Sequence, residues 1–209
     1  MAASRRFRLV IFDLGGVLVD VEPLRALAPV TQATGKSAED IGDIFHDPAL
    51  LEPFELGQIG PQDYFDEVTR RLGVTWTFER FVGVWNSMLR EHPRHAAILA
   101  HLRPQYQLLI LTNTNVLHDE TIRSWPAFHH AHHWIASYQV GFRKPQPQIY
   151  ELALRQAGVA PTEALYVDDI ESHVTAARRL GVTAIQMTNG MDLERVLREA
   201  GIQASPAGP

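Results

Sequence analysis

Short apolar runs, each about the length of one strand, occur at wide intervals along the chain. Three runs, at 7–12, 107–112 and 164–167, are rich in β-branched or aromatic residues and are bounded by charged, Asn or Gly residues. Continuous apolar character over so few residues is typical of a parallel strand that is buried on both faces. Two further candidates lie at 134–137 and 182–187. The pattern predicts five strands of a mainly parallel sheet.

Helical patterns separate these strands and indicate the fold class. They cover residues 94–102, 147–157 and 172–180. Strands that alternate with helices predict a doubly wound α/β fold with a Rossmann-like sheet. Ligands of such sheets bind at the carboxyl ends of the strands. Residues that directly follow a strand are therefore candidate functional residues.

The segment after the first strand breaks this alternation. From about residue 22 to 91 the chain shows several amphipathic helical patterns, which are punctuated by Gly and Pro. Strand-like alternation is scarce there. We expect a small helical cap domain (residues 21–91) inserted into a core that is formed by residues 1–20 and 92–209.

Composition excludes several classes of function. The chain has 209 residues, of which 45% are apolar and 21% charged, and this suits one globular α/β domain with a modest insertion. The net charge of −5, without any run of Lys or Arg, argues against a nucleic-acid partner. The absence of cysteine excludes disulfides, thiol nucleophiles and thiolate metal sites. We find neither a cleavable signal sequence nor the ~18 apolar residues of a membrane span, so we expect a soluble, cytoplasmic protein.

Polar residues follow the first two predicted strands. Asp13 is followed by Gly15 and Gly16, and glycines allow a tight backbone turn around a ligand. A carboxylate in this place can attack phosphorus or ligate a metal, or it can cap a helix. Thr112 and Asn113 follow the second strand, where their polar groups can bind an anion or cap the next helix. Neither segment distinguishes these alternatives by itself.

A lysine and a pair of carboxylates complete the set. Lys144 precedes Pro145 at a helix entrance, where it can point toward the sheet edge or lie in solvent. Asp168 and Asp169 follow a buried strand, and adjacent carboxylates repel each other unless a positive charge lies near them. A hard cation such as Mg²⁺ is the usual solution, although one Asp could cap a helix while the other faces solvent. Because all these residues are expected at one sheet edge, together they predict a site for phosphate and metal.

Four stretches of the sequence resemble the four motifs of hydrolases of the haloacid dehalogenase (HAD) superfamily. The stretches FDLGGVLVD, LILTNTN, GFRKP and LYVDD contain Asp13, Thr112 with Asn113, Lys144, and Asp168 with Asp169. The resemblance runs from about residue 7 to 190, and a helical cap after the first motif is similar to that family's arrangement. The residues after TNTN and RKP look most like the bacterial branch that includes α-D-glucose-1-phosphate phosphatase.

The resemblance implies a Mg²⁺-dependent phosphatase that acts on a small phosphorylated metabolite, with sugar phosphates as the expected class. Asp13 would be the covalent nucleophile and form an aspartyl-phosphate. The implied Mg²⁺ ligands are the carboxylates of Asp13 and Asp169 and the main-chain carbonyl of Gly15. Asp168 would support the metal directly or through water.

The second and third motifs would bind the phosphate. The resemblance implies that the hydroxyl of Thr112, the N–H of Asn113 and the backbone at Gly15 hold phosphate oxygens. Lys144 would bridge Asp13 and the phosphate and stabilise the charge of the transition state. Positioning and charge neutralisation of this kind supply most of the acceleration in phosphoryl transfer.

Two positions depart from the family pattern. Most phosphatases of the family carry a second Asp two residues after the nucleophile, as the acid that protonates the leaving oxygen and then activates water. That position is Gly15 here, so Asp20, Glu22 or a cap residue could supply the acid, or the substrate could have a good leaving group. The second departure is His173, where the family usually has Asn or Asp. A histidine there could still donate a hydrogen bond to the metal-bound carboxylates.

Two other functions stay open on the sequence alone. A weakly active or inactive homologue that binds phosphates is compatible with Gly15. A 2-haloacid dehalogenase would share the nucleophile, the lysine and the missing second Asp, but metal-free dehalogenases resemble Ser-Ser-Asn where this chain has Asp168 and Asp169. The substrate, the oligomeric state and the pathway are not encoded in any pattern that we can identify.

Overall fold

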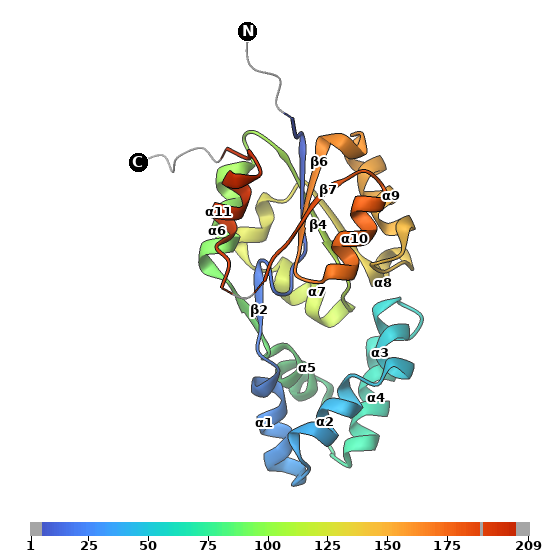
Figure 1. Cartoon of the computed structure of the whole chain (residues 1–209). Coiled ribbons are helices and arrows are strands. Elements are labelled where there is room, and N and C mark those ends of the chain that lie inside the picture. Colours follow the sequence, from blue (N-terminus) through green and yellow to red (C-terminus); the bar gives the residue numbers. More distant parts are fainter. Residues whose placement is uncertain (1–5, 189, 204–209) are drawn as a thin grey trace.

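A five-stranded parallel sheet forms the framework of the computed structural model, which describes residues 6–188 and 190–203. Its strands are β1 (Leu9–Phe12), β4 (Gln107–Thr112), β5 (His133–Ala136), β6 (Ala164–Asp168) and β7 (Thr183–Gln186). The order is β5-β4-β1-β6-β7, and every neighbouring pair is parallel. All five predicted strands form, within two residues of their predicted bounds. The central strand β1 therefore ends between the ends of β4 and β6 (Figure 1).

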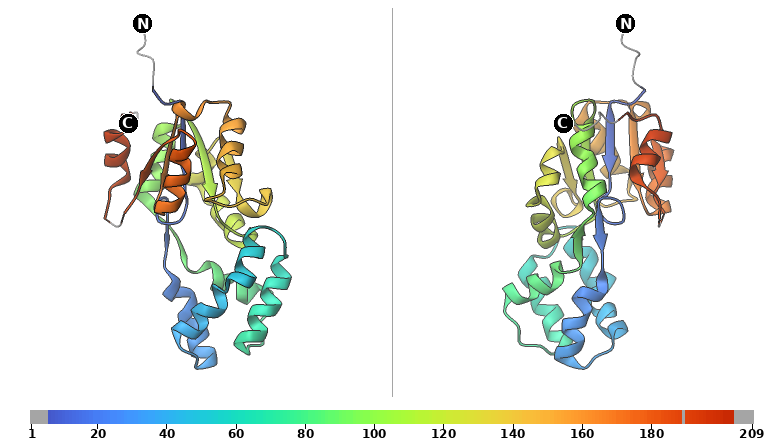
Figure 2. Two further views of the ribbon diagram at one scale, coloured as in Figure 1. Left: turned by 45° about the vertical axis from the view of Figure 1, so that its right-hand side comes forward. Right: turned by 90° about the vertical axis from the view of Figure 1, so that its left-hand side faces the viewer.

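Helices cover both faces of this sheet, which confirms the predicted doubly wound α/β architecture (Figures 1 and 2). One face packs against α6 (Pro93–Leu102), α7 (Val116–Arg123) and α11 (Leu193–Glu199). The other face packs against α9 (Pro147–Ala157) and α10 (Glu171–Arg179). The short helices η1 (Pro126–His130), α8 (Ser137–Val140) and η2 (Pro161–Glu163) lie in the connections. None of the described helices has the length and apolar character that crossing a membrane requires.

The central strand is buried on both faces because its side chains alternate between two apolar layers. Val10 and Phe12 contribute to one layer, and Leu9 and Ile11 contribute to the other. Each of these side chains is at most 1% exposed, and burial of such a side chain contributes about 1.5–3 kcal/mol to stability. The residue that follows this strand, Asp13, is therefore attached to one of the most firmly held parts of the protein.

Five helices follow β1 in the chain and lie together beyond one end of the sheet (Figure 1). They are α1 (Pro23–Thr34), α2 (Ala38–Phe45), α3 (Pro48–Glu55), α4 (Pro61–Leu72) and α5 (Phe78–Asn86). Aromatic residues dominate their interior, where the ring of Tyr64 contacts Phe54, Phe81 and Trp85. Since these helices have an apolar interior of their own, we call them the helical insertion.

A two-stranded antiparallel ribbon joins the helical insertion to the sheet. It consists of β2 (Val19–Val21) and β3 (Leu89–Glu91), with Asp20 opposite Arg90. We did not predict these strands, because three residues are too few to show the two-residue periodicity of a half-buried strand. The ribbon brings both ends of the helical insertion close to the carboxyl end of β1.

Candidate active site

Asp13 directly follows β1 and is almost fully buried. Its N–H donates a hydrogen bond to the carbonyl of Val167 on the neighbouring strand β6 (3.0 Å). Its Oδ1 accepts a hydrogen bond from the N–H of Leu14 (2.7 Å) and lies 2.8 Å from Nζ of Lys144. The backbone and the carboxylate of Asp13 are thus both held in place, with a cation beside the carboxylate.

Lys144 is a buried cation between two carboxylates. Its Nζ lies 2.8 Å from Oδ1 of Asp13 and 2.7 Å from Oδ2 of Asp168, and the residue is 2% exposed. Burial alone would lower the pKa of Lys144, but the two carboxylates outweigh burial and raise it. The two carboxylates therefore favour the charged form of the lysine.

The side chain of Asn113 holds the backbone of Lys144 from across the sheet edge. Its Nδ2 donates a hydrogen bond to the carbonyl of Lys144 (2.9 Å), and its Oδ1 accepts one from the N–H of Lys144 (2.8 Å). These paired contacts fix the lysine's main chain without using the main-chain N–H of Asn113. A second amide, that of Asn115, caps α7 by accepting hydrogen bonds from Leu117 and His118. The TNTN stretch therefore combines helix capping with positioning of Lys144.

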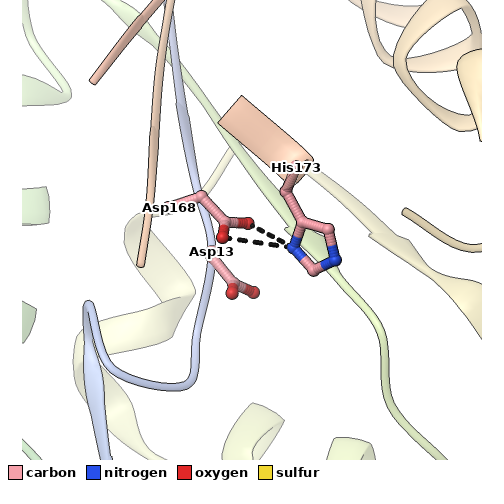
Figure 3. A group of neighbouring side chains, drawn as sticks. All are labelled: Asp13, Asp168 and His173. Atoms are coloured by element: carbon pink, nitrogen blue, oxygen red, sulfur yellow. Dashed lines mark hydrogen bonds and ion pairs between the residues drawn. The ribbon is translucent and has the colours of Figure 1, made fainter. Parts of the chain in front are cut away.

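Asp168 is fully buried, and both of its oxygens accept hydrogen bonds. Its carboxylate accepts hydrogen bonds from Lys144, from the hydroxyl of Tyr166 and from the N–H of Ile170. Nδ1 of His173 lies 3.1 and 3.2 Å from the two oxygens (Figure 3). Burial alone would raise the pKa of Asp168, but the charge of Lys144 and these hydrogen bonds lower it. Asp168 is therefore an ionised anchor for Lys144.

The negative charges of the two other site carboxylates, Asp13 and Asp169, are less well balanced by neighbouring positive charges and hydrogen-bond donors. Burial raises the pKa of Asp13 to about 7, with Lys144 opposing the shift and the negative charge of Asp168 adding to it. Asp169 is half-buried, and burial together with the charge of Asp168 raises its pKa. Three carboxylates thus lie near one ammonium group, so the site has an excess of negative charge that favours binding of a cation.

The two glycines at positions 15 and 16, which follow Asp13 and Leu14, differ in what surrounds them. Gly16 has a φ of +70°, and a Cβ there would lie 2.4 Å from Oδ2 of Asp169. Gly16 therefore allows the loop to approach the carboxylate of Asp169. A Cβ at Gly15 would meet nothing closer than the side chain of Val21 at 3.5 Å, which is an ordinary contact. Sterics thus do not explain why residue 15 lacks a side chain.

A cleft of about 510 Å³ opens over these residues, and most of the predicted site lines it. The predicted residues on its wall are Asp13, Gly15, Thr112, Asn113, Lys144 and Asp169. Asp20 lines a neighbouring cleft of about 450 Å³, on the side of Gly16 and His95. The carboxylate of Glu22 lies 3.3 Å from Arg25 and 3.1 Å from Arg90. Neither Asp20 nor Glu22 is among the described residues that line the cleft of Asp13.

Three residues of the site were not identified as such from the sequence. Tyr166 bonds to Asp168, and the two-residue repeat of a strand could have placed both side chains on one face of β6. Arg143 and Glu55 line the cleft and form an ion pair, with Nη2 of Arg143 3.3 Å from the Glu55 carboxylate. Glu55 belongs to the helical insertion, and no periodicity reveals how that insertion faces the sheet.

Comparison with known proteins identifies the family. The model of the haloacid dehalogenase-like hydrolase family matches residues 7–181. The chain is 26% identical to the D-ribitol-5-phosphate phosphatase of Bacteroides thetaiotaomicron, covering 90% of this chain and 95% of that protein. It is 27% identical to the phosphorylated carbohydrates phosphatase of Thermotoga maritima, covering 93% and 92%.

A solved structure shows the same fold. It is the crystal structure of a HAD-family enzyme of Bacteroides thetaiotaomicron in complex with magnesium and inorganic phosphate. That structure superposes with a TM-score of 0.83 at 24% sequence identity, covering 92% of this chain and all of that one. The match extends through the sheet and the helical insertion, and the four sequence motifs lie within the matched family region. The chain therefore belongs to the haloacid dehalogenase-like hydrolases, as its motifs predict.

Proposed function

We propose that this hydrolase is a Mg²⁺-dependent phosphomonoesterase that acts on a small phosphorylated metabolite of the sugar or polyol phosphate class. The observation that carries this proposal is the convergence of Asp13, Asp169 and the buried Lys144 on one cleft at the sheet edge. The names of two relatives, a D-ribitol-5-phosphate phosphatase and a phosphorylated carbohydrates phosphatase, support the substrate class.

The donor groups of the site fit a hard divalent cation. Oxygen atoms of Asp13 and Asp168 and a ring nitrogen of His173 lie within 4.8 Å of one another, and Asp169 borders the same cleft. Mg²⁺ prefers carboxylate and carbonyl oxygens, so the carboxylates of Asp13 and Asp169 and the main-chain carbonyl of Gly15 would hold it. Because Asp168 is already engaged by Lys144, it would support the metal through water. The magnesium in the related crystal structure is in line with this assignment.

The chemistry that we propose begins with attack of the Asp13 carboxylate on phosphorus, which forms an aspartyl-phosphate and breaks the ester bond. Lys144 would favour the ionised form of the Asp13 carboxylate and stabilise the charge on the phosphoryl oxygens. Thr112 and the N–H of Asn113 would hold two of those oxygens. The bound metal would neutralise phosphate charge. Water would then attack phosphorus and release the Asp13 carboxylate.

We further propose that residues 21–91 act as a cap over this chemistry, on a core of residues 1–20 and 92–209. Two contacts dock the helical insertion beside the cleft. Nη1 of Arg143 lies 3.0 Å from the Glu52 carboxylate, and Oγ of Ser137 donates a hydrogen bond to the carbonyl of Glu55 (2.6 Å). A cap in this position would exclude water while the phosphoryl group is transferred.

Phosphate release from a panel of sugar, polyol and nucleoside phosphates, with Mg²⁺ and with EDTA, tests the proposed function. We expect turnover only with Mg²⁺ and its loss in Asp13→Asn. Asp43→Asn is the matched control, since Asp43 is an exposed residue of α2. Substantial activity of Asp13→Asn would contradict the covalent mechanism. Halide release from a 2-haloacid without Mg²⁺ would instead favour a dehalogenase, and no turnover of any phosphate would favour a binding protein.

A further inference from the structure

Glu55 is a carboxylate of the helical insertion that lies in the same cleft as Asp13. It is the last residue of α3, and its side chain is 16% exposed. Nη2 of Arg143 lies 3.3 Å from its carboxylate, and its carbonyl accepts the 2.6 Å hydrogen bond from Ser137. The side chain and the main chain of Glu55 are thus both fixed against the core.

The proposed reaction needs a proton donor that the loop after Asp13 does not provide. A phosphate ester with a poor leaving group requires a proton on the departing oxygen, and Gly15 has no side chain that could donate one. The carboxylates that line the cleft, among the described residues, are those of Asp13, Asp169 and Glu55. In the proposed function Asp13 is the nucleophile and Asp169 binds the metal. Glu55 is the remaining carboxylate, to which the proposed function assigns no role.

The surroundings of Glu55 favour its protonated form. Burial raises the pKa of Glu55, and the negative charge of Glu52 adds to the shift while Arg143 and Lys144 oppose it. A carboxyl group with a raised pKa is a better proton donor near neutral pH than an exposed one, which would already be ionised. Glu55 also lines the same cleft as Lys144 and Asp13.

We propose that Glu55 is the general acid and base of the hydrolysis, in place of the carboxylate that residue 15 lacks. This role rests on the proposed phosphatase function. As the bond from Asp13 to phosphorus forms, the ester P–O bond breaks and its electron pair stays on the leaving oxygen, which takes the proton of Glu55. In the second step the Glu55 carboxylate accepts a proton from water while the water oxygen bonds to phosphorus. The bond from phosphorus to Asp13 then breaks and restores the Asp13 carboxylate.

A neighbouring glutamate separates this role from simple docking of the helical insertion. Glu52 also pairs with Arg143, at 3.0 Å, but its side chain is 56% exposed and it does not line the described part of the cleft. If the pairing with Arg143 were the sole purpose of both glutamates, their neutral variants would behave alike. A proton-donating role predicts that they differ, and that the difference depends on the leaving group.

The experiment compares Glu55→Gln with Glu52→Gln on two substrates, an alkyl phosphate such as a polyol phosphate and p-nitrophenyl phosphate, whose leaving group needs no proton. For Glu55→Gln we expect kcat/KM for the alkyl phosphate to fall by about 10²–10⁴-fold and kcat/KM for the aryl phosphate to change little. Because water activation is also impaired, nitrophenol should appear in a burst equal to the enzyme concentration. Glu52→Gln should keep the wild-type ratio of the two kcat/KM values and show no burst.

Each result decides the role of Glu55. An unchanged alkyl-to-aryl ratio in Glu55→Gln, whether activity is retained or lost equally on both substrates, would overturn it. The same holds if Glu52→Gln reproduces the effect. If the wild-type protein hydrolyses neither substrate nor any phosphate of the panel, both the proposed function and the role of Glu55 are contradicted. Wild-type turnover that is lost in Asp13→Asn, with an unchanged Glu55→Gln ratio, would overturn the role of Glu55 alone.

Discussion

Nζ of Lys144 lies 2.8 Å from Oδ1 of Asp13, and the two side chains are only 1% and 10% exposed. Asp13 follows the central strand, whereas Lys144 comes from the loop before α9, so the fold creates this pair. The second carboxylate on Lys144, that of Asp168, is not exposed at all. Removal of one member of such a group leaves the other charges buried without compensation. Lys144 therefore matters for stability as well as for chemistry.

We expect Lys144→Met to lower the free energy of unfolding by about 3–5 kcal/mol, because Asp13 and Asp168 then lie in the interior without their cation. Turnover should be lost as well. Urea denaturation measures the change, and Lys36→Met, at a half-exposed position near the end of α1, is the control. Addition of Asp13→Asn should restore part of the stability, since it removes one unpaired charge. A Lys144→Met protein as stable as the wild type would show that the ion pairs contribute no net stability.

The strand ends could be predicted from the sequence because a buried parallel strand has a strong local signal. Asp13, Thr112 and Asp168 each lie at the end of such a run, and the sheet brings the ends together. The role of the Asn113 side chain was not predictable, since it depends on the path of a loop that comes much later in the chain. Glu55 was harder still, because its place follows from how an entire helical insertion is oriented. Local patterns therefore predicted which residues meet at the sheet edge, while contacts between distant elements determined the rest of the site.

The space at residue 15 leads to a second prediction. A Cβ at Gly15 has room, so Gly15→Asp should fold and present a carboxyl group to the leaving oxygen. If Glu55 already supplies the proton, the gain in kcat/KM for alkyl phosphates should be small in the wild-type background and large in the Glu55→Gln background. A double-mutant cycle of the two substitutions measures this dependence. Gly15→Asn, which cannot donate a carboxyl proton, is the control. Equal gains in both backgrounds would mean that the two carboxyl groups do not share a role.

Docking of the helical insertion can be tested at Gly57, which has a φ of +68°. A Cβ there would lie 2.2 Å from the carbonyl oxygen of Tyr138 in α8, so Gly57→Ala should push the insertion away from the core. Gly35 is the matched control, because its φ is +70° and a Cβ would meet nothing within 4 Å. Both alanine variants should cost about 1–2 kcal/mol in backbone strain. We expect kcat/KM to fall by about 10²-fold in Gly57→Ala alone, since displaced groups lose their alignment. Equal kcat/KM in the two variants would contradict a docking role.

A histidine between the helical insertion and the core should make stability depend on pH. The ring of His118 in α7 stacks on Trp85 of α5, with centroids 4.9 Å apart and planes inclined by 12°. Its Nε2 is buried and has no hydrogen-bond partner among the described residues. Burial lowers the pKa of His118 to about 4. The folded protein therefore keeps this ring neutral in a range where the unfolded chain protonates it.

The direction of the effect follows from proton uptake. Between the unfolded pKa of 6.5 and the folded pKa of about 4, the unfolded state binds the proton and the folded state does not, so stability falls as the pH is lowered. From pH 7 to pH 5 we expect His118 to account for about 2 kcal/mol of lost unfolding free energy. Urea denaturation at both pH values should show a smaller loss in His118→Gln than in the wild type. His101→Gln, at a partly exposed position in the last turn of α6, should keep the wild-type pH dependence. If the His118→Gln variant also keeps the wild-type pH dependence, His118 is protonated in the folded protein, and its charged ring remains stacked on Trp85.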